Sequence, residues 1–268
     1  MQSKVIIITS GKGGVGKTTT TAHLGTALAL LGKKVAVIDA DIGLRNLDII
    51  LGLENRIVYD LVNVIEGTCK LSQALIRDKR VKNLSLLPAA QSRTKDAVKP
   101  VEMKKICDEL RQTFDYVLVD SPAGIEGGFQ TALAGADSAI IVTTPHVSAV
   151  RDADRIIGLV EAAEKGTPQL IINRLQAEMV KRGDMLDQDD VVDILSIRLL
   201  GIVPEDEAIV TSSNRGESVA SDARARSGEA YRRIARRIEG EDVPLMDLDA
   251  GNGFFNRIKK MISHQAAS

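Results

Sequence analysis

A glycine-rich stretch near the start of the chain could hold phosphate groups. Residues 11–18 read GKGGVGKT and match the pattern G-x-x-x-x-G-K-[ST], between an apolar strand pattern and a helical pattern. Glycines let backbone N–H groups close around phosphate oxygens, and the start of the helix adds a positive dipole. Lys17 can neutralise the β- and γ-phosphates, and the Thr18 hydroxyl suits Mg²⁺. The pattern predicts a site for ATP and Mg²⁺ formed by Gly11, Gly13, Gly14, Val15, Gly16, Lys17, Thr18 and Thr19.

Carboxylates end two other apolar runs. VAVID (35–39) ends in Asp39 and leads into DADIGLRNLD, which adds Asp41, and YVLVD (116–120) ends in Asp120. Carboxylates at the ends of strands beside the phosphate loop lie in the crevice where α/β sheets bind ligands. We expect Asp120 to hold Mg²⁺ through water. No Glu follows Asp120, so the basal hydrolysis is predicted to be slow; a merely solvated loop of acids is the alternative for Asp39 and Asp41.

The candidates for binding the nucleotide base come later in the chain. LIINR places Asn173 just past an apolar run, followed by Arg174. A carboxamide can donate and accept hydrogen bonds at once, which matches the edge of adenine. A strand that ends in Asn by chance is the alternative. PEDEA supplies a weaker second candidate pocket with Pro204 and Asp206.

These residues need a framework of alternating strands and helices. Continuous apolar runs, typical of strands covered on both faces, occupy 4–9, 35–39, 84–88, 116–120, 139–144, 169–173 and 199–204. Helical patterns between them cover 17–31, 101–112, 147–164 and 228–238. The alternation predicts an α/β fold, a mainly parallel twisted sheet flanked by helices on both faces, as in P-loop NTPases.

Composition excludes several classes of protein. The formal net charge of −1 gives no global attraction to nucleic acid or to an anionic membrane, so such binding needs a local patch. Cys69 and Cys107 form no CxxC or Cys/His cluster, which argues against a zinc or iron–sulfur site. No apolar run approaches the roughly 18 residues of a membrane-spanning helix, and we expect no signal peptide.

The C-terminal end has a different character from the rest of the chain. Residues 239–252 are acidic and contain Pro and Gly, which predicts a flexible linker between an ATPase domain (1–238) and a tail (253–268). At about 100° per residue, the apolar side chains of the tail share an arc of roughly 120°. We expect a short amphipathic helix that lies in an anionic membrane surface, or else docks on a protein surface. Its residues are Phe254, Phe255, Arg257, Ile258, Lys259, Lys260, Met261 and Ile262.

The sequence KGGVGKT, with its extra Lys12, resembles the deviant Walker A box of the ParA–MinD family of P-loop ATPases. The resemblance implies an ATP-dependent homodimer in which Lys12 reaches the nucleotide of the partner subunit. It also implies that Asp39 belongs to the Mg²⁺ shell, that Asp41 orients the attacking water with Asn46 nearby, and that Asn173 reads adenine. SPAG (121–124) resembles the second switch of the family, in which the Gly124 N–H could approach the γ-phosphate.

Within that family, the order of motifs resembles the septum-site-determining ATPases over nearly the whole chain. The motifs are SGKGGVGKTTT, DADIGLRNLD, YDLVNVIEG, DSPAGIE, VRDADRI, RGDML and GIVPED. The resemblance implies a location in the cytoplasm and at the inner face of the cell membrane. The implied partners are the division inhibitor MinC and the activator MinE, which we expect on the helix with Arg151, Asp152 and Asp154. An exposed, salt-bridged helix face is the alternative for those three residues.

Two other functions remain open at this point. A partition ATPase of the same family would bind non-specific DNA, and YRRIARRI (231–238) carries four arginines. On a helix these arginines lie outside an apolar stripe, as on any docked surface helix, so DNA binding is not favoured. A scaffold that uses nucleotide only for stability is the third hypothesis.

Overall fold

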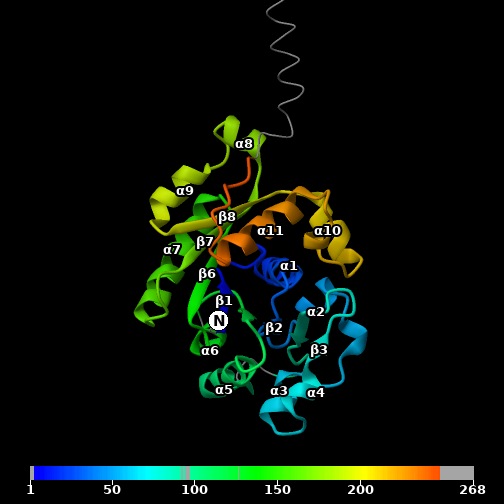
Figure 1. The fold of residues 1–268 in the computed structure, drawn as a ribbon. Helices are drawn as coiled ribbons and strands as arrows, with labels where there is room; N and C mark the ends of the chain where they lie inside the picture. Colours follow the sequence, from blue (N-terminus) through cyan, green and yellow to red (C-terminus); the bar gives the residue numbers. More distant parts are fainter. Residues whose placement is uncertain (1–2, 92, 94–96, 126, 248–268) are drawn as a thin grey trace, which may run out of the picture.

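The structure is a computed structural model that describes residues 3–91, 93, 97–125 and 127–247. Within these residues, eight strands form one sheet in the order β3-β4-β2-β5-β1-β6-β7-β8, parallel except for the pair β3 and β4 (Figure 1). This confirms the predicted fold class. The strands are β1 (Lys4–Thr9), β2 (Val35–Asp39), β3 (Ile76–Arg77), β4 (Leu84–Leu87), β5 (Tyr116–Asp120), β6 (Ser138–Thr143), β7 (Gln169–Leu175) and β8 (Arg198–Pro204).

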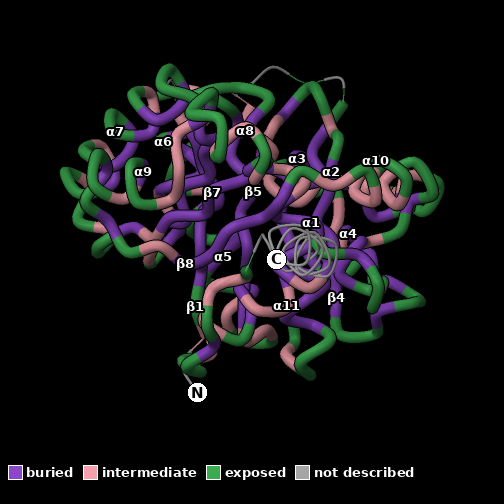
Figure 2. Tube along the Cα trace, turned by 90° about the horizontal axis from the view of Figure 1, so that it is seen from above, coloured by how far each residue is buried: buried purple, intermediate pink, exposed green. Residues whose placement is uncertain are grey.

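Helices cover both faces of this sheet. They are α1 (Lys17–Leu30), α2 (Leu47–Ile50), α3 (Leu61–Ile65), α4 (Leu71–Ala74), α5 (Pro100–Leu110), α6 (Gly127–Ala134), α7 (Val147–Ala162), α8 (Ala177–Lys181), α9 (Gln188–Leu195), α10 (Glu207–Asn214) and α11 (Arg226–Ile238), with short 3₁₀ helices η1 (Glu54–Arg56) and η3 (Val219–Ser221). The strands form a buried centre, and the outer faces of the helices are exposed (Figure 2). Among the residues that the structure describes, no helix combines the length and the hydrophobicity that a membrane span requires.

Side chains that alternate along each strand divide the core in two. Ile7 and Val119 belong to one apolar cluster with α5, α6, α7 and α9, whereas Ile8 and Leu118 belong to the other, with α1 and α11. Successive residues of a strand point to opposite faces of a sheet, so a continuous apolar strand serves both clusters. The phosphate loop and the carboxylates therefore rest on a sheet that is buried on both sides.

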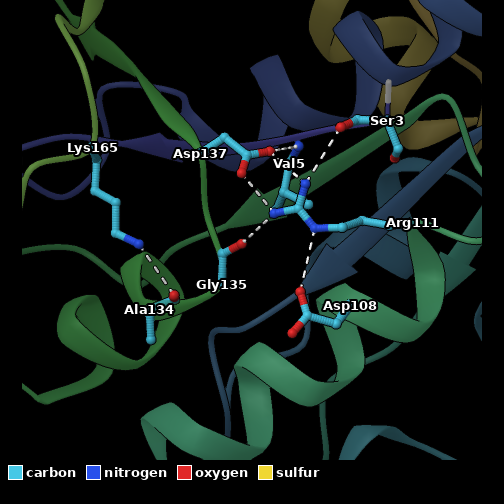
Figure 3. Close-up of polar contacts among 8 residues, drawn as sticks. All are labelled: Ser3, Val5, Asp108, Arg111, Ala134, Gly135, Asp137 and Lys165. Atoms are coloured by element: carbon cyan, nitrogen blue, oxygen red, sulfur yellow. Dashed lines mark hydrogen bonds and ion pairs between the residues drawn. The ribbon is translucent and has the colours of Figure 1, made fainter. Parts of the chain in front are cut away.

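Arg111, which follows α5, forms a cluster of hydrogen bonds at the amino-terminal end of β1 (Figure 3). Its guanidinium donates two hydrogen bonds of 2.7 Å to the Asp137 carboxylate and others to the carbonyls of Ser3 and Gly135. Asp137 also accepts the Val5 N–H at 2.8 Å. Burial raises the pKa of Asp137, but the hydrogen bonds from Arg111 and the Val5 N–H lower it by more. The pKa therefore lies below its usual range. This cluster joins α5, β1 and the segment before β6.

Residues 239–247, which we call the C-terminal strap, follow α11 and lie against the body. Glu239 accepts a hydrogen bond from the Tyr116 hydroxyl at 2.6 Å and pairs with Lys33, and Val243 is buried. The described part of the expected linker is therefore docked rather than free, because its acids and its valine find partners on the body. Other contacts with α11 are hydrogen bonds from Arg236 to Glu241, from Arg233 to the Pro244 carbonyl and from Arg226 to the Asp247 carbonyl.

The rest of the expected linker (248–252) and the expected amphipathic tail (253–268) lie outside the described residues. The predicted tail residues, from Phe254 to Ile262, therefore remain predictions.

Candidate nucleotide-binding site

The phosphate loop connects the end of β1 to the start of α1, as the sequence predicts. Gly14 and Gly16 have φ angles of +79° and +99°, which side chains rarely tolerate. A Cβ on Gly11 would lie 2.1 Å from the carbonyl oxygen of Asp152 in α7, so only glycine fits there. No described residue accepts a hydrogen bond from the backbone N–H groups of residues 13–19. These unpartnered donors at a helix start suit an anion such as a phosphate chain.

The two lysines of the loop lie in different surroundings. Lys17, at the start of α1, is 7% exposed, and burial lowers its pKa while Asp120 and Asp41 oppose that change. Lys12 is exposed, and its Nζ donates to the Ser148 hydroxyl of α7 at 3.3 Å. Lys17 therefore belongs to the interior of the site, whereas Lys12 lies at its surface.

Asp39 and Asp120 end neighbouring strands and are paired residues of β2 and β5. They are 1% and 0% exposed. Burial, and then the charge of the other carboxylate, raises the pKa of Asp120 to about 8, against the effects of Thr18, Lys17 and Thr21. Burial also raises the pKa of Asp39 to about 6, against the N–H groups of Asp41 and Leu47. Two buried acids at this spacing are destabilising unless a cation joins them.

This pair fits a Mg²⁺ ion. The Asp120 Oδ2 atom is buried without a hydrogen-bond partner among the described residues, while Oδ1 accepts a hydrogen bond from the Thr21 hydroxyl at 3.2 Å. Mg²⁺ prefers oxygen ligands and usually takes one or two carboxylates together with substrate phosphates. Asp39, Asp120 and the Thr18 hydroxyl offer that set at the open end of the phosphate loop. Thr21, which the sequence analysis overlooked, holds Asp120 from the next turn of α1.

Asp39 also organises the loop that follows it. Its two carboxylate oxygens accept the N–H of Asp41 at 3.0 Å and the N–H of Leu47 at 3.3 Å. This loop carries Asp41, whose Oδ1 is buried without a partner among the described residues, and Asn46, which precedes α2. A carboxylate that binds both a metal ion and this loop can couple metal binding to the position of Asp41.

The loop after β5 comes close to the phosphate loop. A Cβ on Gly13 would lie 3.8 Å from the Ala123 side chain, which is ordinary van der Waals contact. Gly124 follows with φ of +90° and open space around its Cα. The structure thus places Ala123, the residue before Gly124, beside the loop, and the approach of Gly124 to a γ-phosphate remains a prediction.

The expected base-binding residues split into two groups. Asn173 is 2% exposed and directs its Nδ2 group to the Val15 carbonyl at 2.7 Å, while Arg174 is exposed and has a φ of +58°. Pro204 ends β8 opposite Leu175. Asp206 has both carboxylate oxygens engaged by the protein, since they accept hydrogen bonds from Ala208 and Ser227. Asp206 therefore caps α10 and holds the start of α11, and its role in base binding stays a prediction.

The residues expected to bind a partner lie on α7, which contacts the phosphate loop at Gly11. Arg151 and Asp154 are exposed and Asp152 is half-buried. None of the three forms an ion pair or side-chain hydrogen bond with another described residue, so the salt-bridged face is not what the structure shows. Their charges are available on the surface of α7.

The arginines of α11 do not form an available basic patch. Tyr231, Ile234 and Ala235 are buried, as the stripe predicts. The four arginines all donate to protein acceptors: Arg232 to the Ala220 and Asp222 carbonyls, Arg233 to Glu229 and the Pro244 carbonyl, Arg236 to Glu241, and Arg237 to the Leu199 carbonyl. This arrangement gives no support to DNA binding on this helix.

Comparison with known proteins agrees with this geometry. Residues 6–219 match the family model described as the CobQ/CobB/MinD/ParA nucleotide binding domain. The septum site-determining protein MinD of Bacillus subtilis is 57% identical over 259 residues, which cover 96% of this chain and 97% of that protein.

Two solved structures are similar over most of their length. The MinC:MinD cell division protein complex of Aquifex aeolicus aligns with a TM-score of 0.86 and 53% identity, over 91% of this chain and 99% of that chain. The MinD protein of Pyrococcus horikoshii complexed with Mg-ADP aligns with a TM-score of 0.80 and 28% identity, over 88% of this chain and 96% of that chain. The chain therefore belongs to the MinD family of septum-site-determining ATPases.

Proposed function

We propose that this protein is an ATP-driven switch that places the cell-division site by binding reversibly to the membrane. The observation that carries the proposal is the meeting of a phosphate loop, a buried lysine and two buried strand-end carboxylates at one edge of the sheet. ATP binding makes the dimer, the dimer binds the membrane through two tails, and hydrolysis releases it. The fold and the family agree with an ATPase of this kind.

Different residues of the site bind the nucleotide, bind Mg²⁺ and position the attacking water. The N–H groups of residues 13–19 and Lys17 hold the phosphates, and Asn173 meets the adenine base. Thr18, Asp39 and Asp120 would hold Mg²⁺, which neutralises the charge that develops on the phosphates when it is bound. Asp41 orients the attacking water. Because no Glu follows Asp120 to serve as a strong general base, basal hydrolysis is slow and depends on a partner.

Lys12 acts across the dimer. It is exposed and contacts α7 rather than the interior of its own loop, so its ammonium group can reach a nucleotide bound to a second copy. A charge supplied in trans makes hydrolysis depend on dimerisation, as an arginine finger does.

The partners follow from the family and from the free charges of α7. The Aquifex aeolicus relative was solved in a complex with MinC. We propose that the division inhibitor MinC binds here, and that MinE activates hydrolysis, through Arg151, Asp152 and Asp154. We further propose that the tail at 253–268 binds an anionic membrane surface, which places the protein in the cytoplasm and at the inner face of the cell membrane.

Dimerisation allows a tail that binds the membrane weakly on its own to hold the protein there. Partial burial of five apolar side chains yields a few kcal/mol, and three cations near anionic lipid add about 1 kcal/mol each, less the cost of ordering the segment. Two linked tails bind more tightly than one by roughly 10² to 10⁴-fold. A single tail is thus reversible, whereas the ATP-bound dimer stays on the membrane.

Sedimentation with anionic lipid vesicles tests the proposal. The full chain, a version ending at Asp249 and the variants Lys12→Ala and Asp41→Ala are compared in ATP and in ADP. Of the two chain lengths, we expect only the full chain to pellet, and only in ATP. Lys12→Ala should stay in solution, and Asp41→Ala should pellet but fail to release. If the full chain stays in solution in ATP, the membrane proposal is wrong and retention on DNA becomes the next assay.

A further inference from the structure

Asn173 joins strand β7 to the phosphate loop, 158 positions away in sequence. Its side chain is 2% exposed, and its Nδ2 group donates to the Val15 carbonyl at 2.7 Å. The sequence suggested only contact with the base for this residue. A contact with the phosphate loop gives it a second role that does not need the base.

The contact fixes the direction of a phosphate-binding group. No peptide bond among the described residues is cis, so the C=O of Val15 and the N–H of Gly16 point in opposite directions from one planar unit. With the Val15 carbonyl held toward β7, the Gly16 N–H points away from β7. No described residue accepts a hydrogen bond from that N–H. Asn173 therefore sets the orientation of one of the loop's free donors.

Close packing limits any other arrangement. A Cβ on Gly16 would lie 2.3 Å from Nδ2 of Asn173, and Gly16 has a φ of +99°. The pairing of β7 with β8 shifts between Asn173 and Leu175, and Arg174 between them has a φ of +58°. Bulges of this kind redirect side chains, and a positive φ at a non-glycine residue is strained. The local backbone is thus distorted at the point from which Asn173 reaches the loop.

The other end of the carboxamide is not used by the protein. Asn173 Oδ1 is buried and has no hydrogen-bond partner among the described residues. One side chain can therefore hold the phosphate loop through Nδ2 while Oδ1 remains an acceptor.

We propose that Asn173 is a positioning residue of the phosphate loop, which it fixes through the Val15–Gly16 peptide whether or not a base is bound. This rests on the proposed binding of ATP at the loop and deepens it. A residue that read only the base would affect ATP and ADP but not a polyphosphate without a base.

Calorimetric titration with ATP and with tripolyphosphate, each with Mg²⁺, separates these roles. The proteins are the full chain, Asn173→Ala and Asn173→Asp, with Asn83→Ala and Asn83→Asp as controls at an exposed site before β4. We expect Asn173→Ala to weaken the binding of both ligands roughly tenfold or more, because a buried carbonyl loses its donor. Asn173→Asp should be the worse variant, since its ionised oxygens face the Val15 carbonyl. The controls should bind as the wild type does.

Two outcomes would overturn the proposal. Unchanged binding of tripolyphosphate with weakened binding of ATP would reduce Asn173 to a reader of the base. A smaller loss in Asn173→Asp than in Asn173→Ala would indicate that only side-chain volume matters, because Asp keeps the shape of Asn. Thermal unfolding of each variant is measured beside the titrations, so that loss of the fold is seen separately. Wild-type protein that binds neither ligand would contradict the proposed function and this inference together.

Discussion

At the scale of the residue, the site buries three ionisable groups close together. Asp39 and Asp120 are buried carboxylates with raised pKa values, and Lys17 is a buried ammonium with a lowered pKa. Lys17 and the Thr21 hydroxyl favour the charged form of Asp120, and the N–H groups of Asp41 and Leu47 favour the charged form of Asp39. Strongly perturbed pKa values from burial and from a specific charged partner are typical of functional sites.

His23 offers a test of how burial within α1 contributes to stability. It is 0% exposed, its Nδ1 lies 3.0 Å from the Ser218 hydroxyl, and its Nε2 has no partner among the described residues. Burial lowers its pKa from 6.5 to about 3. Between those values the unfolded chain binds a proton that the folded protein does not. The contribution of His23 is therefore complete above pH 6.5 and is lost as the pH falls toward 3.

We predict that His23→Gln reduces this pH dependence. Relative to the variant, the wild type should lose about 1 kcal/mol of unfolding free energy per pH unit below pH 6.5. Urea unfolding of both proteins at pH 7.5, 6.5 and 5.5 measures the difference, and other groups cancel in the comparison. Parallel curves for the two proteins would show that His23 does not titrate on unfolding.

The residue types and their spacing predict most of the groups of the site, but they do not predict which of those groups contact one another. Glycines, Lys17 and Thr18 in a fixed spacing identify a phosphate loop because the backbone conformation needs those residues. The bond from Asn173 to Val15 has no local signal, because it depends on how β7 packs beside the loop. The bond from Ser227 to Asp206 likewise joins distant segments and has no local signal, and the role of Asp206 in base binding stays a prediction.

At the scale of the element, strongly apolar strands were predictable and short elements were not. β1, β2, β5 and β7 are continuous apolar runs, which only a sheet buried on both faces explains. β3 has two residues, Ile76 and Arg77, and exists because it pairs with β4. Short helices such as α2 and α8 have four and five residues. These are too few to show a helical periodicity in the sequence, so such helices could not be predicted.

The packing of α7 on the phosphate loop is an element-scale contact with a functional consequence. Gly11 approaches the backbone of Asp152 so closely that a methyl group would lie 2.1 Å from its carbonyl oxygen. A backbone atom cannot rotate away, so Gly11→Ala must move α7 or the loop. The helix that we propose as the partner site thus rests directly on the ATP site.

We predict that Gly11→Ala weakens ATP binding at least tenfold and lowers the melting temperature, as measured by calorimetry and thermal unfolding. The matched control is Gly158→Ala on α7, where nothing lies within 4 Å of the added methyl group. Ala favours a helix interior over Gly by about 1 kcal/mol, so the control should bind ATP normally and melt higher. Normal ATP binding by Gly11→Ala would show that the loop and α7 move independently.

At the scale of the whole molecule, the strap decides where the chain leaves the body. It runs back along α11, so that Asp247 lies near Arg226 at the start of that helix, and Met246 and Asp247 line a cavity with Leu175 and Ala177. Leu175 and Ala177 lie at and just beyond the carboxyl end of β7, the edge of the sheet that carries the nucleotide site. We call the part of the chain between the docked body and the proposed tail at 253 the tether. With the strap docked, the tether comprises residues 248–252 rather than residues 239–252.

Tether length governs how strongly two tails on one dimer cooperate. A tether of residues 248–252 reaches at most about 17 Å, whereas one of residues 239–252 reaches about 48 Å. Once a tether spans its sites, the effective concentration of the second tail at the membrane falls roughly as the −3/2 power of tether length. Release of the strap should therefore lower that effective concentration roughly fivefold. Val243, which is 6% exposed, is the buried side chain that holds the middle of the strap.

We therefore predict that Val243→Asp shifts ATP-dependent vesicle binding to about fivefold more lipid, because a buried carboxylate expels the strap and lengthens the tether. Val58→Asp adds the same charge at a valine that is 77% exposed and should bind as the wild type does. Lipid titration of both variants in ATP gives the midpoints, and the ATPase rate without vesicles shows whether the site is intact. Equal midpoints for Val243→Asp and the wild type, with the strap shown to be protease-sensitive only in the variant, would mean that tether length does not limit membrane binding.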